Sequence, residues 1–385
     1  MATGAGGALS TGAPGSVLVV SSEPADATTT IFFGGRLDVP GDNLHVVRHD
    51  RRNYATPLAA ANAIILVRGL FEFADISHCG HALGTPTYYF CDDNFMVLRD
   101  HGEPAARFAQ AYTDDRVRAA LRPCAGVLVS TSALAEFFAQ RQLHPRIHLY
   151  PPMMATPVPH RHDAQRATHV AFFGGRHLHA FFHDPILPAL RRVAARQPLT
   201  LTTVGLDDRI GPSPGLTISH LPYQPSYEAG VAALERARAG VLLHPLATDL
   251  PNNRYKNPHA LITALALGAM PVVSNAAPYA DAVASHAALG CDDTEESWCQ
   301  QIQRAVADRA VRHAVHDRLT AYCRERFDGS INRQVIRGIL ETHPSPDPMW
   351  QPFRSAAAAT HLIVSRAGRA VASRMARSAD GPERS

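Results

Sequence analysis

The alternation of short apolar runs with longer helical stretches constrains the fold of this chain more than any other feature of its sequence. The alternation runs from about residue 16 to residue 150 and begins again near residue 168. Strands that are apolar throughout and are separated by helices predict a parallel sheet that is covered on both faces. We therefore expect an α/β protein with two doubly wound, Rossmann-like domains, and a length of 385 residues fits that number.

Individual elements follow from the same pattern. The expected strands are Ser16–Ser21, His45–Arg48, Ala63–Arg68, Pro86–Cys91, Gly126–Ser130, Ile147–Tyr150, Thr168–Phe173, Leu199–Val204, Thr217–His220, Gly240–His244 and Val272–Ser274. The expected helices are Arg116–Leu121, Ser132–Arg141 with Ser132 as its N-cap, one that begins at Asp184-Pro185, Tyr227–Arg238 and Trp298–Arg326.

A proline-rich segment separates the two alternating regions. Four prolines fall in the nine positions from Pro151 to Pro159, and such a segment continues neither a helix nor a central strand. It predicts a domain linker. The expected organisation is a flexible N-terminus at 1–15, a first domain at 16–150, a linker at 151–160, a second domain at 161–343 and a C-terminal segment at 344–385.

The C-terminal segment contains an Ala-rich stretch with several arginines, Phe353–Arg377. This pattern indicates a basic amphipathic helix on anionic lipid, a helix that packs back onto the first domain, or a frayed tail. We favour packing on the first domain or a frayed tail, and we keep peripheral membrane contact as the alternative.

The composition excludes several classes of function. A formal net charge of +3 is too small for a nucleic-acid-binding surface, so we expect no nucleic-acid partner. The six cysteines form no CxxC pair and indicate reduced thiols in a cytosolic protein. The histidines show no ligand spacing with carboxylates or thiolates, so no metal site is expected. Apolar segments fall short of the roughly 20 residues that span a bilayer, which indicates the cytoplasm or the inner face of the cell membrane.

The segment at 245–268 carries most of the chemical information in the sequence. Asn257 is expected to cap a helix, with Pro258 at its first position and Gly268 just past its end. The free N–H groups at the start of this helix then lie at the carboxyl edge of the second sheet, where ligands of open parallel sheets bind.

Arg254 and Lys256, the chain's one lysine, come just before that helix. Two cations beside the positive end of a helix dipole repel it unless an anion is shared among them. The arrangement predicts a bound diphosphate. A solvated loop with two ordinary cations is an alternative of equal weight.

Other loops at the carboxyl ends of strands are weaker candidates. Gly174, Gly175 and Arg176 follow one strand, and glycines allow the backbone to approach a phosphate closely, although a tight turn explains them equally well. Gly205 ends the next strand, and Ser274 begins a loop on the same edge.

Asp92 and Asp93 end a strand of the first domain. Carboxylates at this position can bind a sugar hydroxyl, act as acid or base, or hold a metal. A role in capping the next turn is the comparable alternative.

The segment from Asn252 to Pro258, with Ala264–Pro271 (ALALGAMP) and the later Val272-Val273-Ser274 and Pro278-Tyr279, resembles the donor-site region of GT-B glycosyltransferases. It is most similar to the bacterial group 1, or family 4-like, enzymes that build surface polysaccharides and other glycoconjugates. The run from Tyr88 to Asp93 resembles the family's aspartate pair at the end of a first-domain strand. The likeness covers about residues 16–340.

The resemblance implies two Rossmann-like domains that face each other across a cleft. The first domain binds the acceptor, and the second binds a nucleoside-diphosphate sugar, with no further cofactor and no metal required. Arg254, Lys256 and Asp92 are the implied catalytic residues. The implied donor-binding residues are Gly174, Gly175, Arg176, Gly205, Asn252, Asn257, Thr263 and Ser274.

One position departs from the family pattern. Members of the family usually carry a glutamate that holds the nucleotide ribose, and the matching position here is Thr263. A hydroxyl bonds ribose less strongly than a carboxylate does. The leading hypothesis is a glycosyltransferase acting on a glycan, lipid-linked or small-molecule acceptor. The alternatives are a degenerate GT-B protein that binds a nucleotide sugar or a partner enzyme without catalysis and, last, a GT-B epimerase.

Overall fold

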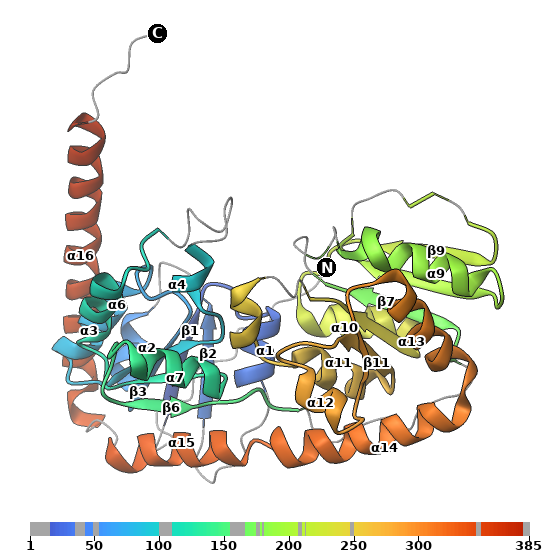
Figure 1. Cartoon of the computed structure of the whole chain (residues 1–385). Coiled ribbons are helices and arrows are strands. Elements are labelled where there is room, and N and C mark those ends of the chain that lie inside the picture. The colour runs from blue at the N-terminus through green and yellow to red at the C-terminus, as the bar shows by residue number, and fades with distance from the viewer. Residues whose placement is uncertain are drawn as a thin grey trace, which may run out of the picture.

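The structure is a computed structural model, and it describes most of the chain. The described residues are 16–34, 43–48, 54–99, 110–154, 166–174, 178, 181–206, 210–211, 213–246, 250–343 and 348–379. Within them the chain forms two six-stranded parallel sheets, each accompanied by helices (Figure 1). The expected α/β class with two doubly wound domains is confirmed.

The first sheet has the strand order β2-β1-β3-β4-β5-β6. Its strands are β1 Ser16–Ser21, β2 Asn43–Arg48, β3 Ala63–Val67, β4 Thr87–Cys91, β5 Gly126–Val129 and β6 Ile147–Leu149. The helices around it are α1 Ala27–Phe33, α2 Ala55–Ala60, α3 Ala74–Ala82, α4 Phe95–Leu98, α6 Asp114–Leu121 and α7 Ser132–Gln140. Strands β3, β4 and β5 are buried along their whole length, as fully apolar strands of a covered parallel sheet should be.

The second sheet has the order β12-β11-β10-β7-β8-β9. Its strands are β7 His169–Phe173, β8 Leu199–Val204, β9 Leu216–Leu221, β10 Val241–His244, β11 Met270–Ser274 and β12 Leu289–Cys291. The helical elements are η4 Phe182–Ile186, α9 Leu187–Ala194, α10 Tyr227–Arg236, η5 Pro251–Tyr255, α11 His259–Leu267, α12 Ala280–Ala284 and α13 Glu295–Ala307. Strand β12 was not expected from the sequence.

Several helix boundaries differ from expectation. The predicted helix Trp298–Arg326 is two helices, because Asp308 leaves the helical conformation and its carboxylate caps α14 (Arg309–Arg326) by accepting from the N–H of Val311. The predicted cap at Ser132 is instead Thr131, whose hydroxyl accepts from Leu134 at 3.2 Å. Asp184 has extended dihedrals inside η4, and α9 begins only at Leu187.

Helix α11 also begins later than predicted. Pro258, not Asn257, occupies the cap position, and the side-chain oxygen of Asn257 accepts no hydrogen bond from the described part of the chain. The expected end is confirmed: Gly268 follows Leu267 in the left-handed conformation, at φ 62°.

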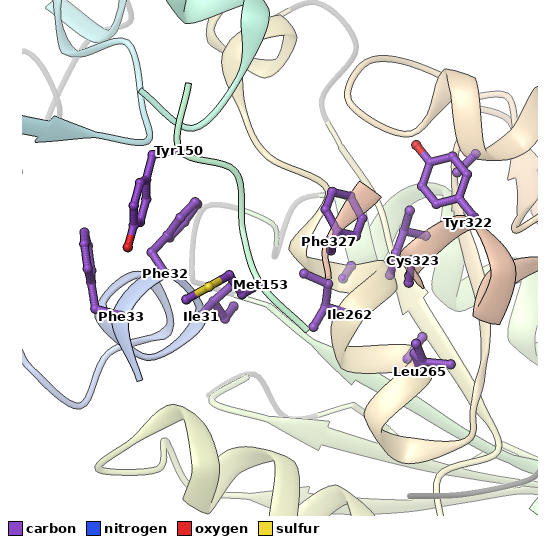
Figure 2. Packing of buried hydrophobic residues seen from close by; sticks show 14 of the residues in the cluster. Ile31, Phe32, Phe33, Tyr150, Met153, Ile262, Leu265, Tyr322, Cys323 and Phe327 are labelled. Atoms are coloured by element: carbon purple, nitrogen blue, oxygen red, sulfur yellow. The ribbon is translucent and has the colours of Figure 1, made fainter. Parts of the chain in front are cut away.

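The described start of the linker, residues 151–154, is held between the two domains. Met153 donates its N–H to Ile31 at 3.0 Å, and Met154 donates to Phe327 at 2.9 Å. Figure 2 shows the Met153 side chain between first-domain residues such as Phe32 and second-domain residues such as Ile262. A single buried apolar cluster therefore continues from one domain into the other.

The chain returns to the first domain after the second sheet. Helix α14 is followed by α15 (Ser330–Thr342), and the two run end to end beside both domains (Figure 1). The last elements are η6 Pro348–Trp350 and α16 Gln351–Ala379, which packs on α2 and α3. Among the described residues, no helix is both long enough and apolar enough to cross a bilayer.

Candidate functional site

The candidate site begins at a loop of the second domain that is anchored on the first. The Asn252 side chain accepts from the N–H of Asn94 at 3.0 Å and donates to the carboxylate of Asp93 at 3.1 Å. Three residues on, the buried ring of Tyr255 packs edge-on against Phe137 of α7, with centroids 5.4 Å apart. Element η5 is thus held to the first domain near both of its ends. We call these contacts of Asn252 and Tyr255 the clasp.

A groove between the domains opens beside this clasp and encloses about 470 Å³. Its first-domain wall comes from the end of β5 and the start of α7, and its second-domain wall includes Arg254, Lys256 and Pro258. The junction of α14 and α15 closes the third side. The two residues with the strongest sequence signal are therefore brought together in one groove, at the carboxyl edge of the second sheet.

The cations of this groove differ in their pairing. Arg326 forms an ion pair with Asp281 at 2.9 Å, so its charge is compensated. Among the described residues, no carboxylate forms an ion pair with Arg254 or Lys256; the guanidinium of Arg254 only lies over the ring of Tyr255, 5.0 Å from its centroid. Two cations without an ion pair at one wall create a site for an anion.

The facing edge of the first domain is acidic. Arg68 has a left-handed backbone, at φ 62°, and its guanidinium grips Asp92 through two hydrogen bonds of 2.6 Å. The second oxygen of Asp92 also accepts from the hydroxyl of Thr28 at 2.8 Å. Asp93 and Asp26 lie farther from the same guanidinium, at 3.4 and 3.7 Å.

These contacts give Asp92 and Asp93 different tasks. Burial lowers the pKa of Arg68, but the charges of Asp92, Asp93 and Asp26 outweigh burial and hold its pKa above the usual value. The pKa of Asp93 is raised by burial and by the charge of Asp92, although Arg68 and Lys256 oppose the shift. Asp92 is fully engaged in the ion pair, whereas Asp93 is a carboxyl group whose proton is held more firmly than usual.

His259, the first residue of α11, lies between these two charged regions. Burial and the charge of Lys256 lower its pKa to about 4, despite the opposing charge of Asp92. Its ring packs edge-on against His244, with centroids 5.2 Å apart, and His244 in turn contacts the hydroxyl of Tyr279 at 3.0 Å. At neutral pH an uncharged imidazole therefore lies next to an ammonium group.

Two predicted donor residues sit in the same segment with different roles. Asn252 is occupied by the clasp to the first domain. The side-chain oxygen of Asn257 is buried and, among the described residues, has no hydrogen-bond partner. Since an unsatisfied buried acceptor is costly, Asn257 is the residue here that a donating ligand would satisfy.

Thr263 is buried within the second domain. Its hydroxyl lies 2.6 Å from the hydroxyl of Tyr227 and 3.1 Å from the carbonyl of His259, to which it donates. The ring of Tyr227 stacks on Phe173, at the end of β7. The residue at the position of the family glutamate is therefore already bonded within the protein.

Local packing, backbone conformation and hydrogen bonding account for the residue types at Gly174, Gly205 and Ser274. A Cβ on Gly174 would lie 2.7 Å from Leu178, and Gly205 has a φ of +74° that favours glycine. The hydroxyl of Ser274 accepts from the N–H of Leu246 at 2.8 Å, which fixes the loop after β10. Gly175 and Arg176 lie outside the described residues.

Sequence reasoning missed Arg68, Asp26 and His259. Arg68 and Asp26 come just after β3 and β1, so the rule that selected Asp92 would have selected them as well. His259 could have been selected because it is a titratable residue at the start of a predicted helix. In the described part of the chain, no group of three or more His, Cys, Asp or Glu side chains is placed to hold a metal ion.

The fold is similar to that of several solved structures, at low sequence identity. An alpha-glucosyltransferase in complex with UDP and a 13-mer DNA has a TM-score of 0.58 and 12% identity, over 86% of this chain and 100% of that one. HepE of Anabaena, in complex with UDP and glucose, has a TM-score of 0.56 and 12% identity, over 85% and 99%. Trehalose-6-phosphate synthase has a TM-score of 0.53 and 12% identity, over 85% and 99%.

No protein-family model matches the chain, and no curated protein matches it. The likeness to the solved structures covers both domains, and the expected GT-B fold is confirmed.

Proposed function

We propose that the protein is a glycosyltransferase, similar to the bacterial group 1 enzymes, that moves a sugar from a nucleoside-diphosphate sugar to a glycan, lipid-linked or small-molecule acceptor. Its products would belong to bacterial surface polysaccharides or glycoconjugates. The observation that carries the proposal is that Arg254 and Lys256, which form no ion pair within the described residues, lie together in the groove between two domains of GT-B fold. The fold of sugar-transferring enzymes that bind UDP supports it.

The chemistry needs positive charge at the leaving group. Negative charge grows on the diphosphate as the glycosidic bond breaks, so cations fixed beside it stabilise the transition state more than the ground state. Arg254 offers a planar fork of donors, and Lys256 offers a compact charge. The proposal assigns this task to the two side chains and to the N-terminus of α11, without a further cofactor or a metal.

The proposed acceptor site depends on the acidic residues at the edge of the first domain. Asp92 is bonded to Arg68 and Thr28, so it would hold the edge in position. Asp93 lies within electrostatic reach of Lys256 and has a raised pKa because it is buried next to Asp92. It is the better group to contact an acceptor hydroxyl.

A thermal-shift panel of nucleoside diphosphates and their sugars tests the proposal. A ligand that binds the folded state raises the melting temperature by mass action. We expect one nucleoside diphosphate and its sugars to raise it, and the Arg254→Ala/Lys256→Ala variant to lose that shift. Arg196→Ala, which removes an exposed cation elsewhere on the second domain, should keep the shift. No stabilisation by any member of the panel would contradict donor binding.

A second candidate follows from Thr263. The position of the family glutamate holds a threonine, and its hydroxyl is already bonded to Tyr227 and to the helix backbone. A protein that binds the nucleotide sugar, or a partner enzyme, without transfer would have this feature. Assays of donor hydrolysis and sugar transfer on purified protein separate the two candidates, since stabilisation without any turnover would favour the second.

The proposal also includes where in the cell the protein acts and which class of acceptor it uses. We place the protein in the cytoplasm, peripheral at the inner face of the membrane, where lipid-linked acceptors are found. One glucosyltransferase of the same fold was solved with DNA, so the exclusion of nucleic acid as a partner stays a prediction.

A further inference from the structure

The outward face of α16 is apolar. Phe353, Ile363 and Val364 are 68%, 65% and 65% exposed, and their spacing places them on one side of the helix. Small exposed residues fill the positions between and beyond them. We call this surface the outer stripe, and it consists of Phe353, Ala356, Ala357, Thr360, Ile363, Val364 and Ala367. Met349 and Trp350, just before the helix, are also exposed, at 68% and 54%.

The opposite face of α16 packs on the first domain through a small number of contacts. Arg354 donates to the carbonyls of Ala59 and Leu83 and to the hydroxyl of Thr85, and Ala358 and Leu362 are buried. A surface helix of a globular protein normally turns its large apolar residues toward the core. Helix α16 turns several of its largest outward, so packing of this chain does not account for the outer stripe.

The helix also continues past the domain on which it packs. Leu362 is the last buried residue among its described side chains, yet the helix runs on to Ala379, a further rise of about 25 Å. Figure 1 shows this part extending beyond the body of the first domain. Residues 351–379 contain five arginines and no aspartate, glutamate or lysine.

We propose that α16 docks this protein on an anionic phospholipid surface through the outer stripe. An apolar face on a helix whose charges are all positive is the combination that binds at a lipid interface. Trp350 and Phe353 supply aromatic rings of the kind that settle at the headgroup level. The inference names the surface behind the peripheral location proposed above, and it does not depend on the transfer reaction.

The charge of α16 favours an anionic membrane over a second copy of the chain or a nucleic acid as the ligand of the outer stripe. Apart from Arg354, which is bonded to the first domain, a second copy of the chain would bring four more arginines near the first four, whereas an anionic membrane compensates them. Nucleic acid would also compensate the arginines but would leave the outer stripe exposed to water. Only a lipid surface matches both properties of the helix.

Vesicle flotation of the full chain, without substrate, tests the inference. The probes are vesicles of phosphatidylcholine alone and vesicles in which part of this lipid is replaced by phosphatidylglycerol. We expect binding to the anionic vesicles only, weakened by added salt. Ile363→Ser/Val364→Ser should lower the partition coefficient about tenfold, because two apolar side chains leave the interface. Both residues are exposed, so circular dichroism and melting temperature should match the native chain.

The matched control is Tyr223→Ser, which removes an apolar side chain that is 81% exposed on the second domain. It should bind anionic vesicles as the native chain does. The inference is overturned if the native chain ignores anionic vesicles, or if Ile363→Ser/Val364→Ser binds them equally well. It is also overturned if the native chain is a dimer in solution that this variant dissolves, because the stripe would then belong to a second copy. Donor binding is measured separately by thermal shift, so either claim can fail alone.

Discussion

At the scale of single residues, charge compensation distinguishes the groups that hold the protein together from those that await a ligand. Asp92 has its charge matched by Arg68 and a hydroxyl, and Arg326 is matched by Asp281. Arg254 and Lys256 have no such match among the described residues. A structural ion pair needs both members, so the unmatched cations are the ones whose loss should affect ligand binding more than folding.

Replacement of Lys256 by alanine tests this interpretation through turnover. We expect Lys256→Ala to lower kcat about 10²–10³-fold, or roughly 3–4 kcal/mol, because the ammonium group stabilises the leaving diphosphate chiefly in the transition state. Steady-state kinetics with the donor found by thermal shift is the measurement. Lys256→Arg, which keeps the charge, should recover part of the loss. Near-native turnover of Lys256→Ala would remove the residue from catalysis.

His259 predicts a pH dependence of stability. Its pKa is about 4 in the folded protein and 6.5 when it is free in solution, so the unfolded chain binds more protons between these values. The stability due to the neutral imidazole is fully present above pH 6.5 and is lost as the pH falls toward 4. We expect this group to contribute up to about 3 kcal/mol of loss.

Denaturant unfolding from pH 7 to pH 4 isolates the effect when native protein is compared with His259→Gln. Asp26 and Asp93, with raised pKa values caused first by burial, titrate in both proteins and cancel in the difference. The native free energy of unfolding should fall more steeply with acid than that of the variant. Parallel curves would contradict the half-buried, uncharged histidine.

At the scale of elements, strands were easier to predict than helix ends. Strands such as β1 and β8 were predicted with the bounds that they have, because uninterrupted apolar runs leave little choice in a buried parallel sheet. Strand β12 was missed because its three residues include Gly290 and carry no pattern. The break at Asp308 was missed because helical periodicity continues across it.

The cap at Asp308 makes a prediction at this scale. Asp308→Ala removes the acceptor for the N–H of Val311 and should lower the free energy of unfolding by about 1 kcal/mol. Asp308→Ser keeps a capping oxygen and should stay within a few tenths of a kcal/mol of native. Chemical denaturation of the three proteins is the measurement. Equal losses in both variants would mean that the cap is not what the alanine removes.

The site was predicted less completely than the strands. Arg254 and Lys256 stood out because two cations precede a helix start, a property of the local sequence. The contacts of Arg68 with Asp92, and of Asn252 with Asp93, depend on which loops of separate elements meet across the sheet edge and the domain boundary. The spacing of residues along the chain does not reveal contacts between such loops. The sequence therefore could not show that Asp92 forms an ion pair.

At the scale of the whole molecule, the two domains share one apolar cluster and a clasp. The clasp joins η5 to the first domain through Asn252 and through the ring of Tyr255. Arg254 lies between these two anchors and Lys256 directly follows the second. The position of both cations is therefore set by the contact between the domains.

Removal of the ring tests the coupling. Tyr255→Ala should destabilise the protein by about 3–5 kcal/mol, since a large side chain leaves a packed site against Phe137. It should also separate the unfolding of the two domains into two steps in differential scanning calorimetry. Tyr255→Phe keeps the ring and should melt in one step near the native temperature. A single native-like transition in Tyr255→Ala would show that the clasp does not couple the domains.

The proposed function requires that a diphosphate binds between Arg254 and Lys256 in the groove. A crystal structure of the protein soaked with its stabilising nucleoside diphosphate measures this most directly. We expect phosphate oxygens about 2.7–3.2 Å from the Lys256 ammonium and from the Arg254 guanidinium. A diphosphate bound elsewhere, with both side chains extended into solvent, would contradict this expectation.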